Sequence, residues 1–156
     1  MVSALASVLR RLAALALALV LCFGLVSAAE AKRSKAKTIS PEDMAVIRRQ
    51  AEEFMEAKDR LPELASLVNE RDWVFTRNLI RGPMQPLGRE MLYINQRLLP
   101  QDRKEADKRA AELKTALAEL DEAARLQDGS RLTKEYSRVA SGFGAYAEMI
   151  PADALS

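Results

Sequence analysis

Histidine is absent from this sequence of 156 residues, and its single cysteine, Cys22, lies in an apolar run near the N-terminus. Histidine is the commonest general base in enzymes and a frequent ligand of zinc and of haem iron. Its absence argues against serine-triad hydrolases, zinc proteases and haem-binding bundles. If the N-terminal run is removed, no thiol remains for a disulfide, a thiolate nucleophile or a cysteine metal site. We therefore predict a protein that is not an enzyme and has no catalytic residues, metal site or cofactor.

The patterns of β-sheets and of phosphate-binding loops are also missing. No segment alternates apolar and polar residues over the length of a strand. Gly82 and Gly88 are not spaced as in a P-loop or a dinucleotide-binding turn. Acidic and basic residues are nearly balanced once the N-terminal segment is set aside, which argues against a general nucleic-acid-binding protein.

The N-terminus has the layout of a secretory signal peptide. Arg10 and Arg11 precede fifteen residues without charge (12–26), and small residues follow up to Ala31. As a helix this run would reach only about 22 Å, which is short of a bilayer core about 30 Å thick. A retained membrane anchor is therefore the weaker alternative. We predict that residues 1–31 are a cleaved signal peptide, although cleavage after Ala28 fits as well and the export route stays open.

Two further features concern the region around the cleavage site. A lipoprotein would keep Cys22 as its acylated first residue, but that processing needs a small residue in front of the cysteine, and here it is Leu21. Lipidation is therefore also the weaker alternative. Residues 32–40 begin with a basic, non-periodic run, which we interpret as a flexible tether.

Residues 41–151 carry a helical period in four successive segments. Apolar residues recur at spacings of three and four in each of them, for example at Leu132, Tyr136, Val139, Phe143, Tyr146 and Ile150. Ser40, Asn69 and Ser130 are candidate N-caps, and Asp102 with Glu105 has the spacing of a capping box. Short connections make sequential helices antiparallel. We predict an all-α, up-down-up-down four-helix bundle, followed by a tail over residues 152–156.

The second predicted helix contains the most unusual stretch of the chain. It starts with the only tryptophan, Trp73, and includes Gly82, Pro83 and Pro86. A proline inside a helix removes a backbone donor and kinks or breaks the helix. The apolar register from Ile80 through Met84 and Leu87 nevertheless continues without a slip. The sequence therefore predicts one kinked helix, with Trp73 anchoring the end of the bundle.

Four polar residues of the same stretch lie off the apolar stripe: Arg77, Asn78, Arg81 and Arg89. One interpretation is a solvated surface. The other is a docking patch for an acidic partner, because the planar guanidinium group can bind a carboxylate with two hydrogen bonds. Both interpretations stay open. The carboxylates within 52–56 and 119–122 lie beside the apolar stripes, and we interpret them as solvated helix surface.

Three segments carry a family resemblance: D-W-V-F-T-R-N-L-I-R-G-P-M-Q-P-L-G from Asp72, R-L-L-P-Q-D from Arg97 and F-G-A-Y-A-E-M-I-P from Phe143. They resemble the PsbQ family, especially its cyanobacterial branch, over about residues 41–151. The resemblance implies a four-helix bundle in the thylakoid lumen, peripheral on the membrane, that serves photosystem II as a non-catalytic extrinsic subunit.

The resemblance also implies a role and neighbours. The role would be to dock beside the protein shield of the manganese–calcium cluster, to stabilise the oxygen-evolving complex and to help retain calcium and chloride. The neighbours would be PsbO and a lumenal loop of the inner antenna protein. Cyanobacterial members are often lipoproteins, which the context of Cys22 does not support, and a family zinc site bound through histidine has no counterpart here. The alternative function is that of a periplasmic helical-bundle chaperone or adaptor with an exposed apolar groove.

Overall fold

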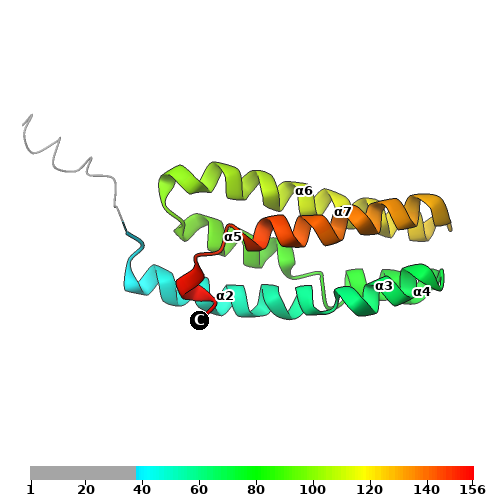
Figure 1. Ribbon diagram of the computed structural model, residues 1–156, viewed down its shortest axis with the longest axis horizontal. Helices are drawn as coiled ribbons and strands as arrows, with labels where there is room; N and C mark the ends of the chain where they lie inside the picture. Colours follow the sequence, from blue (N-terminus) through cyan, green and yellow to red (C-terminus); the bar gives the residue numbers. More distant parts are fainter. Residues whose placement is uncertain (1–37) are drawn as a thin grey trace, which may run out of the picture. The chain divides into compact units, whose positions relative to one another are not determined.

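The computed structural model describes residues 38–156, so the predicted signal peptide, Cys22 and most of the predicted tether lie outside the described residues. All regular structure in this part of the chain is helical. The helices are α2 (Pro41–Asp59), α3 (Leu61–Asn69), α4 (Trp73–Arg81), α5 (Leu87–Arg97), α6 (Pro100–Arg125), α7 (Gly129–Ala147) and the short 3-10 helix η1 (Ala152–Ala154). They form an antiparallel bundle, as predicted (Figure 1).

The bundle consists of four helical layers in sequence order, each made of one helix or of two helices placed end to end. The first consists of α2 and α3, end to end, and the second of α4 and α5. Helix α5 packs against α2, α4 packs against α3, and α6 runs along both α4 and α5. Helix α7 returns beside α6 and also contacts α3, as Figure 1 shows for α6 and α7. The α4–α6 contact positions the candidate site.

The first layer bends between α2 and α3. Helix α2 ends at Asp59 and α3 begins at Leu61, with Pro62 in its first turn. Pro62 has no N–H to continue the hydrogen-bond ladder of α2, so the helix restarts in a new direction.

The second layer is interrupted more completely than the predicted kink. Residues 82–86 form turns, so α4 and α5 are two helices instead of one bent helix. Two prolines within four residues each remove a backbone donor, and turn-type hydrogen bonds such as that from Met84 N to Leu79 O replace the ladder. A Cβ on Gly82 would lie 2.9 Å from Asn78 O, which only glycine avoids. The predicted apolar register nevertheless holds, because Ile80, Met84 and Leu87 are all buried.

Ser40 caps α2 as predicted, by accepting from Asp43 N at 3.1 Å, whereas the other helix starts differ from the predicted caps. Asp72 caps α4 by accepting from Phe75 N at 3.0 Å, and Asp128 caps α7 by accepting from Arg131 N at 3.0 Å. Asn69 is instead the last residue of α3, and Ser130 lies inside α7. Helix α6 begins at Pro100 without a side-chain cap, so the predicted capping box is not formed. The positive φ angles before the two capping aspartates belong to Arg71 (54°) and Gln127 (56°), not to a glycine.

An aromatic cluster fills the centre of the core. The ring centroid of Phe54 lies 5.5 Å from that of Phe143 and 5.0 Å from that of Tyr146. The Tyr146 hydroxyl donates to Asn95 Oδ1 at 2.8 Å and lies 3.1 Å from Met91 O. Tyr146 is thus a core residue, as predicted, and its hydroxyl links α7 to α5.

The residues predicted to be a tail make contacts with the bundle. Helix η1 packs against α2, Ala154 is buried, and Arg48 donates from Nη2 to Asp153 O at 2.8 Å.

Candidate docking surface between α4 and α6

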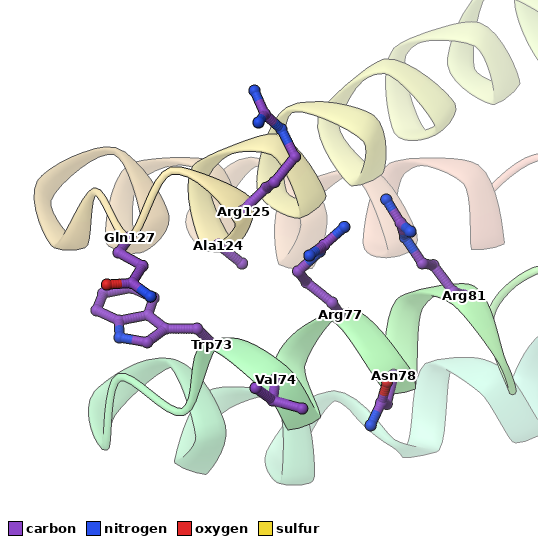
Figure 2. A pocket seen from close by; sticks show the side chains of 8 residues that line it. All are labelled: Trp73, Val74, Arg77, Asn78, Arg81, Ala124, Arg125 and Gln127. Atoms are coloured by element: carbon purple, nitrogen blue, oxygen red, sulfur yellow. The ribbon is translucent and has the colours of Figure 1, made fainter.

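Helix α4 has one buried side, and the candidate site lies next to it. Thr76, Leu79 and Ile80 face the core. Arg77 and Arg81 are one turn apart and point from α4 towards α6, as Figure 2 shows. Val74, at 65% exposure, lies beside them and exposes an apolar side chain to solvent.

Asp121 of α6 binds both arginines. Arg81 donates from Nε to Asp121 Oδ1 at 2.8 Å and from Nη2 to Oδ2 at 2.6 Å, a bidentate pair. Arg77 donates from Nε to Oδ1 at a longer 3.4 Å. The hydrogen bonds from Arg81, followed by the charges of Arg81 and Arg77, lower the pKa of Asp121 below its usual value. This carboxylate therefore stays ionised and holds α4 and α6 together.

The other two predicted docking residues differ in their positions. Asn78 is exposed and points away from the two arginines in Figure 2, yet it lines one surface depression together with them, and it also lines a separate depression with Phe75 and Pro83. Arg89 is exposed on α5, beyond the turn. The structure thus brings Arg77, Arg81 and Asn78 to one depression but does not bring Arg89 there.

Two depressions follow the α4–α6 contact. The first has a volume of about 230 Å³ and lies at the Trp73 end, with the Trp73 and Gln127 side chains in its lining (Figure 2). Its lining residues are Trp73, Val74, Arg77, Asn78, Arg81, Ala124, Arg125 and Gln127. The second has a volume of about 270 Å³ and lies at the helix interruption. Its lining residues are Ile80, Arg81, Met84, Gln85, Leu87, Gly88, Lys114, Leu117, Ala118 and Asp121.

The residues predicted to have structural roles are placed as follows. Trp73 is half-buried and packs against the core at one end of the bundle. Gly82 and Pro83 are exposed in the turn, and Pro86 directly precedes α5. Trp73 therefore serves both the core and the first depression.

Sequence reasoning misses three charged members of this surface. It treats Asp121 as part of a solvated helix surface, and it does not single out Arg125 or Lys114. All three lie on α6, and Asp121 is 44 residues from Arg77 and 40 from Arg81, so no local pattern connects the two helices. The signal that could have found Asp121 is its position beside an apolar stripe.

A second electrostatic feature lies between α2 and α5. Glu90 of α5 is buried, with 4% exposure, and Glu53 and Glu56 of α2 act on it. Burial, followed by the nearby Glu53 carboxylate, raises the pKa of Glu90 to about 7. No group of three or more histidine, cysteine, aspartate or glutamate side chains within residues 38–156 is arranged to hold a metal ion.

None of the helices in the described part of the chain is both long and apolar enough to cross a bilayer.

Comparison with known proteins gives a consistent result. A sequence profile of the PsbQ family, described as Oxygen evolving enhancer protein 3, matches residues 1–151. CyanoQ of Synechocystis sp. is 32% identical over 144 residues, which cover 92% of this chain and 96% of CyanoQ. The profile covers most of the chain, and the alignment leaves little of either protein unmatched. The chain therefore belongs to the PsbQ family, whose members are extrinsic, non-catalytic subunits of photosystem II.

Proposed function

We propose that this protein is a lumenal extrinsic subunit that stabilises the oxygen-evolving complex of photosystem II and helps it to retain calcium and chloride. The observation that carries the proposal is the extent of the family match, which runs over residues 1–151. A binding role needs a stable surface instead of a reactive centre. The fold supports such a role, because the ion pairs between α4 and α6 hold exposed arginines on rigid helices.

Docking uses the outer side of the second layer in this proposal. Arg77 and Arg81 are its central residues, because they share one face and line one depression. Asn78 lines the same depression, whereas Arg89 lies beyond the turn, so a partner that reached all four residues would extend past the turn. The proposed neighbours are PsbO and a lumenal loop of the inner antenna protein.

The proposed location is the thylakoid lumen, peripheral on the membrane through protein contacts. Residues 1–31 direct export and are removed. The tether that follows ends where Ile39 packs against the core and Ser40 caps α2. N-terminal sequencing and mass determination of the mature protein test this. A chain that starts at residue 32 without a lipid supports the proposal, whereas a lipid on Cys22 contradicts it.

The role is tested by removing the protein from photosystem II and measuring oxygen evolution with and without added calcium and chloride. We expect the largest loss of activity when both ions are scarce, and recovery when the purified protein is added back. Equal activity of stripped and intact complexes under ion depletion would refute the stabilising role. Failure of the protein to copurify with photosystem II would refute the assignment itself.

A further inference from the structure

The two depressions along the α4–α6 contact adjoin each other. Arg81 lines both of them, and Asp121, which binds Arg81, lines the second. We call the two depressions together the basic groove. On α6 the lining of the basic groove extends from Lys114 to Arg125, a rise of about 17 Å at about 1.5 Å per residue. An extended peptide of about five residues spans the same length at about 3.3 Å per residue.

The charge of the basic groove is unbalanced. Its lining includes the cationic side chains of Arg77, Arg81, Arg125 and Lys114, whereas Asp121 is its only acidic residue. Asp121 is shared by two guanidinium groups, so one positive charge remains beside it. Arg125 is paired with Glu122, which lies outside the lining.

Hydrogen-bond donors remain free in the basic groove. Arg77 binds Asp121 only through Nε, and no acceptor among residues 38–156 binds its two Nη nitrogens. The Arg77 side chain is 30% exposed, and that of Arg81 is 59% exposed. Lys114 has no ion-pair partner within the described residues. A second carboxylate placed at Arg77 would therefore gain a fork-shaped donor without breaking the pair between Arg81 and Asp121.

The floor of the basic groove is apolar at both ends. Trp73 and Val74 lie in the first depression, and Met84 and Leu117 lie in the second. An occupant that matches this pattern carries acidic residues in its middle and one apolar or aromatic side chain near each end. Aromatic and arginine side chains next to one another are also the common composition of protein-binding hot spots.

We infer that the basic groove binds an extended acidic segment, about five residues long, of a protein partner, with a carboxylate on Arg77 and apolar side chains in the two depressions. This inference rests on the docking role proposed above and names the chemistry of the partner. It also adds Arg125 and Lys114 to the docking residues and leaves out Arg89.

The test is reconstitution of variants onto photosystem II from which the protein has been removed. Arg77→Glu reverses the charge where only one long hydrogen bond is lost, and Arg49→Glu makes the same charge change on the exposed surface of α2. We expect the dissociation constant to rise at least tenfold for Arg77→Glu and less than twofold for Arg49→Glu, with both variants folded at the assay temperature by circular dichroism. Equal effects of the two variants would overturn the inference. Wild-type protein that binds normally in the same assay would show that the proposed function survives such a failure.

The occupant is identified by zero-length carbodiimide cross-linking, which joins a lysine to a carboxylate that it touches. In the assembled complex, Lys114 should couple to an acidic segment of another subunit, and Lys134, which is exposed on α7, serves as the control. Trp73, the only tryptophan, should change its emission on assembly. A cross-link from Lys114 to a second copy of this chain would overturn the inference. Vesicles of phosphatidylglycerol that bind wild type but not Arg77→Glu, with assembly unaffected, would overturn it in favour of a lipid surface.

Discussion

Replacing Glu90 by glutamine should change how the stability of this protein depends on pH. In the folded protein, burial between α2 and α5 disfavours the ionised carboxylate, and Glu53 adds to this effect. The pKa of Glu90 is raised from 4.5 to about 7, so folded Glu90 stays protonated over a range in which the unfolded chain has already lost that proton. The glutamine side chain of the variant resembles the protonated acid in shape and cannot ionise.

The sign and size follow from proton linkage. The contribution of a group with a raised pKa is fully present below the unfolded pKa of 4.5 and is lost as the pH rises through the folded value of about 7. Between pH 5 and pH 8 the expected loss is about 2 to 3 kcal/mol. This is a substantial part of the about 5 to 15 kcal/mol that typical domains have in total. The unfolding free energy of wild type should therefore fall by this amount relative to that of Glu90→Gln.

The assay is urea unfolding of the mature protein, followed by circular dichroism and by Trp73 fluorescence at several pH values from 5 to 8. This range avoids the acid region, in which protonation of Asp121, Glu105 and Glu122, whose pKa values are lowered by arginine partners, destabilises the fold. Glu52→Gln, at an exposed position of α2, controls for the charge change. Glu53→Gln should keep most of the pH dependence, because burial is the larger cause. A free-energy difference between wild type and Glu90→Gln that stays constant within about 0.5 kcal/mol would refute the reasoning.

Three further predictions test the packing with five substitutions. Gly82→Ala should lower the unfolding free energy by about 1 to 3 kcal/mol, because its Cβ would lie 2.9 Å from Asn78 O. Gly144→Ala should raise it by about 0.5 to 1 kcal/mol, because its Cβ meets no atom within 4 Å. If urea unfolding shows that both variants shift the unfolding free energy in the same direction, this prediction is wrong. Tyr146→Phe should lower the unfolding free energy by about 1 to 3 kcal/mol, because Asn95 and Met91 lose their hydrogen-bond contact with the hydroxyl. Tyr136→Phe, in which the lost hydroxyl lies 3.5 Å from Leu61 O, should lower it less when both variants are compared by thermal melting. Phe143→Ala should cost about 3 to 5 kcal/mol, because the ring is fully buried against Phe54; a loss below about 1 kcal/mol in denaturant titrations would mean that the core repacks.

The helices, their order and the bundle were predictable from the sequence because they depend on local patterns. Apolar residues spaced by three and four lie on one face of a helix whatever their neighbours are. The residues of the apolar stripe that begins at Ile80, Met84 and Leu87 and ends at Leu98 are therefore buried. Pro62 marked the bend of the first layer for an equally local reason. Glu90 had a local signal that was overlooked, because it stands three residues after Leu87 and four before Ile94 and therefore on their face.

Only the tertiary structure decided which of two neighbouring residues caps a helix, and whether the second layer is kinked or broken. Asn69 and Asp72 are both good caps, and so are Asp128 and Ser130. The positive φ angles of Arg71 and Gln127 direct the chain so that the two aspartates reach the helix starts. Likewise, either a kink or a full break agrees with two prolines in four residues, and the contacts of α4 with α3 and of α5 with α2 select the break.

The candidate site depended most on the tertiary structure. Arg77 and Arg81 were visible in the sequence as neighbours on one helix face, but the carboxylate that binds them is 40 residues or more away on α6. The Coulomb energy of two charged groups depends on the distance between them and on their burial, and both are set by the fold. The sequence therefore determined which residues carry charge and which face they share, whereas only the packing of α4 against α6 determined that Asp121 neutralises one guanidinium group and leaves the other available.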